Sequence, residues 1–434
     1  MRYRNIDSSL FIKNRERFKA KMKENSIAIF VSNDMMPKGG DSTYPFRQNP
    51  DMFYLSGIDQ EESILVLFPD CPNEDFREVL FLKETNEKIA IWEGAKLTKA
   101  QGTERSGIAN VVWTNTFNSL LPVMMNLATN CYLNLDEHDR YVHLADYAEY
   151  RFAREVKEKF PLHHYERSAP ILHEIRRIKN VEEIELIQHA CHITKKGFER
   201  VLNFTQPGVK EYEIEAEITH EFIKNGSRGH AYEPIIASGF NACVLHYNVN
   251  DQVCKDGDVI LLDFGAEYAN YASDMTRSIP VNGKFTKRQK EVYNAVLRVM
   301  KAATKMLVPG NHIKDYHEAV GQLMEKELVD LGLLTTKEIK KQDPKNPAYK
   351  KYFMHGTSHY LGIDVHDSGS RWAPMKVGNI FTCEPGIYIR EESLGIRLEN
   401  DILITEKGQL DLMADIPLEA DEIEYLMQKK KKKS

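Results

Sequence analysis

The sequence predicts an α+β fold with two domains. A smaller α/β domain comes first, and a C-terminal domain of antiparallel hairpins with helices packed outside follows it. A chain of 434 residues exceeds the size that one hydrophobic core usually serves. Its composition, 42% hydrophobic and 28% charged, is typical of globular proteins. Helical stretches in the second half flank paired strand-and-turn segments, which is an α+β pattern. We expect the domains at 1–165 and 175–426, with a Lys-rich tail at 427–434.

The N-terminal half mixes short apolar strands with helical stretches. Residues 26–32 and 63–68 are predicted strands, because their apolar residues form short continuous runs. Turn-forming residues fill 36–41. This half shows no cluster of metal ligands and no recognisable nucleophile. We therefore interpret it as a domain that supports or restricts a site located elsewhere.

Four helices are predicted in the second half. Asn180 is placed to cap the first, with Glu183 in the capping-box position, and apolar residues then recur at helical spacing. The second ends at Asn225-Gly226, a common helix stop. The later helices are expected at 211–225, 286–307 and 313–331, and the strands at 259–264, 273–280, 380–389 and 395–405.

Composition excludes several classes of protein. The net charge of −6 and the pI near 6.2 argue against nucleic-acid binding. No apolar run approaches the ~18 residues of a membrane span, and the N-terminus lacks a signal-peptide core. The six cysteines contain no Cys-x-x-Cys pair, which favours free thiols in a reducing cytoplasm. The Lys429–Lys433 run is interpreted as a solvated tail.

Four carboxylates lie inside or beside apolar runs of the second half: Asp263, Asp274, Glu384 and Glu399. A buried carboxylate is costly unless it is paired or coordinated. If the four converge, each pair repels by about 4 kcal/mol at 4 Å in a partly screened site. Two divalent cations would cancel that charge. Together with the imidazole of His359, these oxygen ligands suit Mn, Co or Zn.

Asp263 and Asp274 are joined by a connection rich in Gly, Ala, Tyr and Asn. We expect a hairpin that presents one carboxylate from each strand. Opposite residues of a strand pair lie about 4.5–5.5 Å apart, close enough to hold the same ions. The alternative for either residue is that it caps a turn.

Three histidines lie within twelve residues, at positions 355, 359 and 366. The first two have the spacing of a helical zinc site, but Gly356 stands where that motif needs Glu, and Gly362 weakens a helix. We expect one of the three histidines to be a ligand and the other two to face a substrate. Cys383 is interpreted as a packing residue, since nothing near it would deprotonate it.

Alternation along the last strand puts Arg397, Glu399 and Asp401 on one face. A half-exposed surface strand would show the same pattern. The Gly-rich turns just before this strand favour a strand that enters a crowded site.

These motifs together resemble the aminopeptidase P family of metallopeptidases, whose catalytic domain has the pita-bread fold. The similar segments cover 46–57, 241–247, 261–277, 280–286, 355–367, 383–389 and 395–401. The resemblance thus covers nearly the whole chain. It implies a curved antiparallel sheet with outer helices and a smaller α/β domain in front.

The resemblance also implies a dinuclear metal centre, most often with manganese. Asp263 and Asp274 would hold one ion, Asp274, His359 and Glu384 the other, with Glu399 bridging both. A hydroxide between the ions would attack the scissile carbonyl while Glu384 moves the proton. The remaining implied residues are the substrate-facing His246 and His366, the supporting His355, and the substrate-binding Arg397 and Tyr388.

The resemblance implies a metallo-aminopeptidase that removes an N-terminal residue followed by proline. The alternatives are a prolidase, a methionine aminopeptidase, a creatinase-like enzyme without metal, and a non-catalytic binding module. Between Asp367 and Val377 the only arginine is Arg371, which weakens the prolidase alternative. All five ligands are present, which argues against the last two. Asn400 stands where an acidic residue is more usual, but on the face away from the ligands.

The expected partners are peptides with proline in second place, with no nucleic acid and no membrane, and a homodimer or homotetramer is expected. An exopeptidase must limit its substrate to one residue beyond the cleaved bond. We expect the N-terminal domain, from the same or a neighbouring subunit, to provide that wall.

Overall fold

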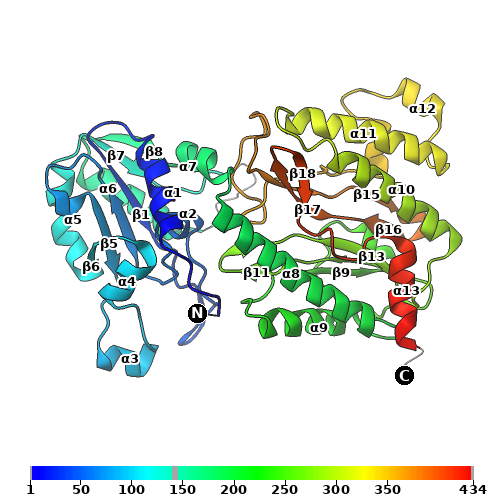
Figure 1. The fold of residues 1–434 in the computed structure, drawn as a ribbon, viewed down its shortest axis with the longest axis horizontal. Coiled ribbons are helices and arrows are strands. Elements are labelled where there is room, and N and C mark those ends of the chain that lie inside the picture. The colour runs from blue at the N-terminus through cyan, green and yellow to red at the C-terminus, as the bar shows by residue number, and fades with distance from the viewer. Residues whose placement is uncertain (1, 139–144, 432–434) are drawn as a thin grey trace. The chain divides into compact units, whose positions relative to one another are not determined.

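The computed structural model describes residues 2–138 and 145–431. These residues form two compact units (Figure 1). One unit is Asn5–Arg176, and the other begins at Arg177 and includes the start of the chain through Arg4.

The N-terminal unit is built on a six-stranded mixed sheet with the order β6-β5-β4-β1-β7-β8. Its strands are β1 (Ser26–Val31), β4 (Ile64–Leu67), β5 (Glu78–Leu82), β6 (Asn110–Trp113), β7 (Asn130–Leu133) and β8 (His164–Arg167), with a small hairpin of β2 (Pro37–Gly39) and β3 (Ser42–Thr43). Its helices are α1 (Ser9–Lys19), α2 (Pro50–Ser56), α3 (Glu87–Glu93), α4 (Lys99–Ser106), α5 (Phe117–Met125), α6 (Ala148–Lys159) and α7 (Ala169–Arg176), with short 3₁₀ turns η1 (Glu74–Phe76) and η2 (Thr114–Thr116).

Strand β1 explains why this unit holds together. It pairs antiparallel with β4 and parallel with β7, and all but its last residue are buried. A central strand covered on both faces needs a continuous apolar run rather than alternation, and Ser-Ile-Ala-Ile-Phe-Val supplies one. The α/β class and the two strands predicted for this half are confirmed.

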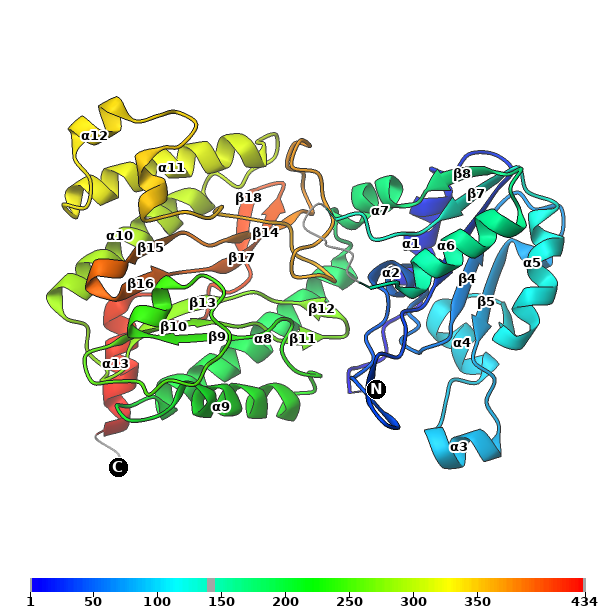
Figure 2. The same ribbon diagram turned by 180° about the vertical axis from the view of Figure 1, so that it is seen from behind.

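The C-terminal unit places its sheets between two helical layers (Figures 1 and 2). The helices are α8 (Val181–Phe204), α9 (Glu211–Lys224), α10 (Lys287–Thr304), α11 (Ile313–Asp330), α12 (Thr336–Lys341) and α13 (Ala420–Lys431), with 3₁₀ turns η3 (Gly239–Cys243), η4 (Ala348–Lys351) and η5 (Arg390–Glu392). Helix α8 packs against α9 on one side of the sheets, and α10 packs against α11 on the other. The predicted α+β class is confirmed.

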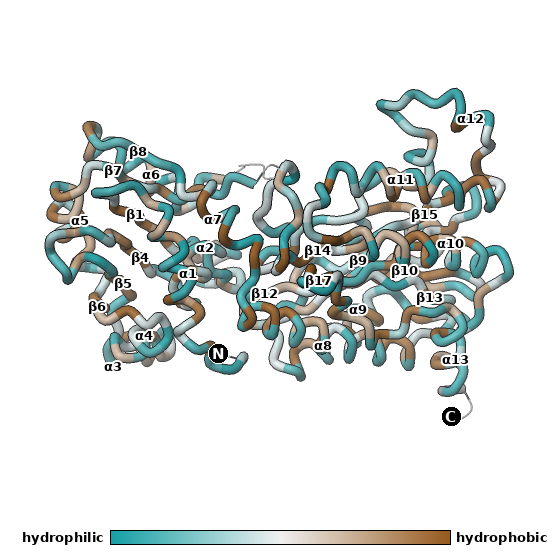
Figure 3. The backbone as a smooth tube through the Cα atoms, turned by 45° about the horizontal axis from the view of Figure 1, so that its top comes forward, coloured by the Kyte–Doolittle hydropathy of each residue, from teal (hydrophilic) through white to brown (hydrophobic). Residues whose placement is uncertain are grey.

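Helix α8 starts where the sequence predicts. Asn180 and Glu183 form a reciprocal capping box, which satisfies backbone donors at the helix start. Hydrophobic and polar residues alternate along α8 and α9 (Figure 3), and the buried face of α8 includes Ile187, Ala190 and Ile193. The three other predicted helices are also present, each ending within three residues of the predicted position.

The strands of this unit form several small antiparallel sheets. Their bounds are β9 (Ile235–Ser238), β10 (Val259–Asp263), β11 (Glu267–Tyr268), β12 (Tyr271–Ala272), β13 (Thr276–Pro280), β14 (Ile380–Cys383), β15 (Gly386–Ile389), β16 (Leu394–Arg397), β17 (Asn400–Thr405) and β18 (Gly408–Asp411). The orders are β13-β10-β9, β14-β17-β18, β15-β16 and β11-β12.

Two long strands of the sequence prediction are each divided in the structure. The run 380–389 breaks at Glu384 and Pro385, where proline has no N–H to donate to a ladder. The run 395–405 breaks at Leu398 and Glu399, between β16 and β17. Both breaks leave a glutamate outside regular pairing.

The predicted Lys-rich tail begins inside α13, and residues 432–434 lie outside the described residues. All six cysteines are free thiols, as predicted, and all are buried. Within the described part of the chain, no helix combines the length and apolar character needed to cross a membrane.

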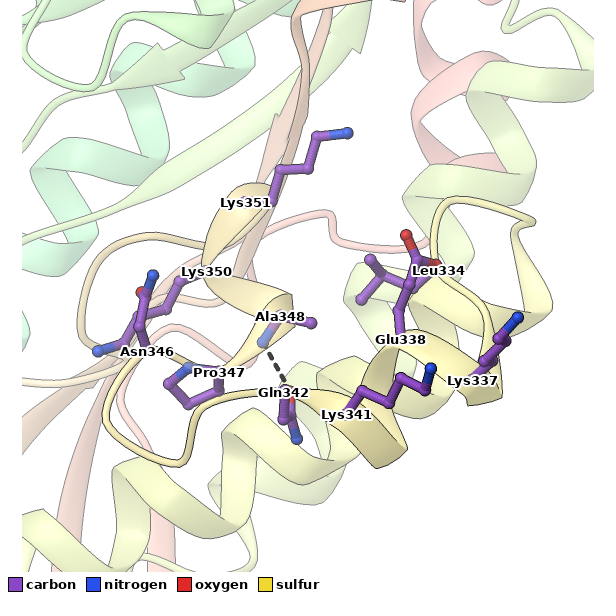
Figure 4. A pocket seen from close by; sticks show the side chains of 10 residues that line it. All are labelled: Leu334, Lys337, Glu338, Lys341, Gln342, Asn346, Pro347, Ala348, Lys350 and Lys351. Carbon is purple, nitrogen blue, oxygen red and sulfur yellow. Dashed lines mark hydrogen bonds between the residues drawn. The ribbon is translucent and has the colours of Figure 1, made fainter.

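A cavity of about 790 Å³ lies between α12 and η4 (Figure 4). Lysines 337, 341, 350 and 351 are among its lining residues, and none of the predicted site residues lines it.

Candidate metal centre

The breaks and ends of the strands bring the five predicted ligands together. Asp263 ends β10, Asp274 lies just before β13, and Glu399 lies between β16 and β17. Donor atoms of Asp274, His359 and Glu399 lie within 4.8 Å of one another. Glu384 follows β14 and reaches the same group, with Oε1 3.7 Å from His359 Nε2.

The hairpin register differs from the prediction. Asp263 pairs with Thr276 rather than with Asp274. Residues 273–275 cross close to Gly265 instead of pairing along β10, and a Cβ at Gly265 would lie 1.7 Å from the carbonyl oxygen of Ser273. Glycine permits this approach of two backbone segments. Asp274 therefore enters the site from a segment outside the regular strands, where its neighbours Met275 and Ser273 still bond to the backbone of Phe264 and Ala266.

Tyr232 joins the two aspartates. Its hydroxyl lies 2.6 Å from Oδ1 of Asp263 and 2.6 Å from Oδ1 of Asp274. A phenol has one proton, so it can donate to only one of these carboxylates at a time. Burial among these acids raises the pKa of Tyr232 well above its usual value.

The ring of His359 is oriented to present Nε2 to the acids. Its Nδ1 lies 3.0 Å from the carbonyl oxygen of Tyr360, which assigns the proton to Nδ1. Nε2 lies 3.5 Å from Oδ2 of Asp274. Burial lowers the pKa of His359, but hydrogen bonding to Asp274 and the charge of Glu384 outweigh it and raise the pKa to about 9. The site thus attracts positive charge.

The carboxylates have little positive charge from the protein. Among the described residues, Arg397 is the only arginine or lysine in an ion pair with them, through Asp263. Burial, with repulsion from Asp274, raises the pKa of Glu384 to about 7 despite the attraction of His359. Burial and the neighbouring acids raise the pKa of Glu399 well above its usual range. Several buried oxygen donors, one imidazole and a deficit of positive charge fit divalent cations.

Arg397 connects the aspartate to a histidine through a chain of hydrogen bonds. Its guanidinium binds Asp263, donates from Nη1 to the Tyr388 hydroxyl at 2.9 Å, and donates from Nε to Thr276 at 3.2 Å. The Tyr388 hydroxyl in turn lies 2.7 Å from His355 Nε2. His355 Nδ1 lies 2.7 Å from the Gly356 carbonyl, so Nδ1 carries the proton and Tyr388 donates to Nε2.

Burial lowers the pKa of His355 to about 3, and the charge of Arg397 adds to this effect. His355 is therefore neutral at physiological pH. Thr276 completes the network, since its hydroxyl accepts from Arg397 and donates to Glu399 at 2.6 Å.

The two histidines that the resemblance places toward a substrate, His246 and His366, are both exposed, whereas His355 is largely covered. The ring of His366 packs edge-on against His359, with 4.3 Å between the ring centroids. His246 follows η3, and this turn packs closely against β16: a Cβ at Gly395 would lie 2.1 Å from the Ala242 carbonyl oxygen. Both can reach a molecule that approaches from solvent.

Sequence reasoning missed three residues that hold the ligands: Tyr232, Thr276 and Arg277. Arg277 is fully buried, and its Nη1 donates to the backbone carbonyl of Glu399 at 2.7 Å. Thr276 and Arg277 follow Asp274 closely in the chain, which is a weak signal of proximity. Tyr232 lies 31 residues before Asp263, and no local pattern in its segment indicates the contact.

Cys383 agrees with its interpretation as a packing residue. It is buried beneath the site, and burial raises the pKa of its thiol to about 11. Asn400 turns away from the ligands, accepts from Arg277 Nη2 at 2.7 Å and donates to Asp411 at 2.7 Å.

Two family patterns match the chain. Residues 185–406 match metallopeptidase family M24, and residues 11–132 match the N-terminal domain of aminopeptidase P. The Xaa-Pro aminopeptidase of Haemophilus influenzae is 35% identical over 433 residues, which covers 96% of each chain.

Solved structures of aminopeptidase P are similar to this chain over nearly its whole length. A putative aminopeptidase P from Bacillus anthracis has a TM-score of 0.90 at 33% identity over 98% of this chain and 99% of the other. A variant of Escherichia coli aminopeptidase P in complex with substrate has a TM-score of 0.88 at 33% identity over 99% of this chain and 100% of the other. The C-terminal unit therefore has the pita-bread fold, and the chain belongs to metallopeptidase family M24, within its aminopeptidase P group.

Proposed function

We propose that this chain is an Xaa-Pro aminopeptidase, which hydrolyses the bond between an N-terminal residue and a following proline. The observation that carries the proposal is the convergence of Asp274, His359 and Glu399, with Asp263 and Glu384 beside them. Relatives with this activity in their names match nearly the whole chain.

The five residues would hold two divalent ions, with manganese expected first and cobalt or zinc as alternatives. When bound, such ions would supply a bridging hydroxide near neutral pH and polarise the substrate carbonyl. The site fits them because three of its four carboxylates are buried, and among the described residues Arg397 is the one arginine or lysine that forms an ion pair with any of the four.

The chain's own groups would orient the substrate and move protons. Glu384 is half-buried and has a raised pKa, which suits a group that takes and returns a proton during hydrolysis. His246 and His366 are exposed, with His366 packed against the ligand His359, and both would bind the peptide from the solvent side.

Arg397, Tyr388 and His355 would stabilise this arrangement from the other side. Their hydrogen bonds run from Asp263 to a neutral imidazole. A neutral His355 accepts from Tyr388 and keeps that hydroxyl at a fixed position. Direct binding of substrate by Arg397 and Tyr388 remains a prediction.

Other features of the proposal concern the whole protein. We expect domain limits at 1–165 and 175–426, a homodimer or homotetramer, and a cytoplasmic location, for which the six free thiols are the support. The N-terminal domain would provide the wall that limits the enzyme to the first residue. Removing residues 1–165 would then loosen substrate choice or change the solution mass.

Three peptides test the activity on protein loaded with Mn²⁺: a tripeptide with proline second, the same tripeptide with alanine second, and the dipeptide that ends in that proline. We expect release of the first residue from the proline-second tripeptide, slower release from the alanine peptide, and loss of activity on chelation. Preference for the dipeptide would make the chain a prolidase. Bound metal with no turnover of any peptide would make it a non-catalytic member.

A further inference from the structure

Asp401 is a buried carboxylate next to the metal centre but outside the set of ligands. It lies on β17 with no exposed surface. Its Oδ2 accepts from the backbone N–H of Asp274 at 3.0 Å and from the thiol of Cys191 at 3.5 Å. Its Oδ1 is buried and has no hydrogen-bond partner among the described residues. No step of the proposed reaction uses this residue.

Asp401 accepts from the Asp274 N–H at a point where no neighbouring strand in the described part of the chain offers that N–H an acceptor. Residues 273–275 lie between β12 and β13 and belong to neither strand. The N–H of Asp274 is therefore outside the ladder of β10 and β13, yet Asp274 is buried. A buried N–H needs an acceptor, because leaving it unpaired costs about as much as losing a hydrogen bond. The Asp401 side chain is the acceptor that it has.

The position of the Asp274 backbone determines where both of its carboxylate oxygens lie. Its Oδ1 lies 2.6 Å from the Tyr232 hydroxyl, and its Oδ2 lies 3.5 Å from Nε2 of His359. Like Glu399, it is also expected to serve both ions. A shift of its backbone would move both oxygens away from their partners.

We propose that Asp401 is a positioning residue that holds the main chain of Asp274 and thereby sets the metal affinity of the site. This inference rests on the metal centre proposed above. Asp401 joins three elements at this point: it is carried by β17, pairs across to Thr382 of β14, and contacts Cys191 of α8. Residues that hold ligands in place typically change metal affinity 10–100-fold when they are removed.

Two substitutions of similar size separate the acceptor from the volume that it fills. Asp401→Asn keeps an oxygen that can accept from Asp274, and Asp401→Leu does not. We expect metal-free Asp401→Leu to bind Mn²⁺ at least about 10-fold more weakly than the wild type, with an altered Co²⁺ absorption spectrum. Its kcat should fall more than its KM rises. Asp401→Asn should stay close to the wild type in all three. If leucine prevents folding, Asp401→Ala makes the same comparison.

Ile404→Ala is the matched control for a purely structural effect. Ile404 lies on the same strand, is equally buried, and its side chain carries no polar atom. We expect this variant to lower the melting temperature without changing the affinity for Mn²⁺. The inference is overturned if Asp401→Leu binds Mn²⁺ as tightly as the wild type, or if Ile404→Ala loses as much affinity as Asp401→Leu. A wild-type protein that binds no Mn²⁺ would instead remove the proposed metal centre, and this inference with it.

Discussion

Acids of the N-terminal unit and acids of the metal centre obtain positive charge in opposite ways. In the N-terminal unit, Asp51 lies 2.8 Å from Arg176 and also accepts from Asn134. Glu78 is bound by both Arg15 and Lys19. In the metal centre, Glu399 accepts a hydrogen bond from Thr276, and Arg397 is the only lysine or arginine that pairs with a site acid among the described residues.

This difference shows what each group of acids does. A buried acid that has its own cation contributes to the fold without any ligand. Acids that converge without enough cations need positive charge from outside the chain. The charge balance of each cluster therefore separates a structural cluster from a binding site more clearly than the number of acids does.

The largest expected effect comes from removing one charge from the metal centre. Asp274→Asn keeps the size of the side chain but loses the charge that holds a cation. We expect bound metal to fall and kcat/KM to drop by about three orders of magnitude or more, on the scale of losing a catalytic metal ligand. Metal analysis and peptide assays measure both effects. An unchanged far-UV circular dichroism spectrum excludes unfolding as the cause, and retained activity would contradict the assignment.

Replacing the exposed histidines should separate binding of substrate from binding of metal. We expect His246→Ala and His366→Ala each to lower turnover by about 10²–10⁴-fold, the usual range for groups that assist in the transition state. Metal content should stay near that of the wild type. If either variant is isolated without metal, that histidine belongs to the ligand set and the assignment is wrong.

The opposite test removes a protein cation from the N-terminal unit. Arg176→Ala leaves Asp51 largely buried without its ion pair, so we expect a loss of about 3–5 kcal/mol of stability in that unit. Hydrogen exchange of peptides from β1 and β7 reports on this unit alone. The affinity for Mn²⁺ should not change. Lys287→Ala, at a side chain that is 94% exposed, is a control for loss of a surface charge.

Glu149 is an exception in the N-terminal unit, because no cation among the described residues pairs with it. Burial and repulsion from Asp136 raise its pKa to about 7 from 4.5. As the pH rises above 4.5, the unfolded chain releases this proton while the folded chain keeps it. Stability therefore falls between pH 4.5 and 7, by up to roughly 3 kcal/mol.

Glu149→Gln removes this pH dependence. We expect it to stabilise the N-terminal unit at pH 8 and to leave it almost unchanged at pH 4, as measured by the exchange of β1 and β7 peptides at each pH. Equal stability of the two proteins at pH 8 would show that Glu149 is ionised at no cost in the fold.

Local signals predict much of this structure. The capping box at Asn180 and the stop at Asn225 mark helix ends correctly, because the residues that satisfy terminal backbone groups lie within one turn. The apolar runs of β1 and β10 also identify strands, because a buried strand needs no distant information to be apolar. The family could be recognised because its motifs are short and contiguous.

Local signals do not predict the pairing register or the hydrogen-bond partners of side chains, because these depend on residues far apart in the chain. The sequence suggests that Asp263 and Asp274 meet across a hairpin, but the close crossing at Gly265 puts Thr276 opposite Asp263 instead. Contacts of Tyr232 with the two aspartates, and of Asp401 with Asp274, span between 31 and 127 residues.

The sequence by itself thus determined the α+β class, the limits of four helices in the second half and the candidate acids and histidines of the site. Tertiary structure alone decided how those groups are held: which carboxylate pairs with Arg397, which nitrogen of His359 faces the acids, and which buried side chain supports Asp274. The physical reason is that secondary structure follows from neighbours along the chain. The charge and hydrogen-bond balance of a buried site, by contrast, is set by groups that meet only after the chain has folded.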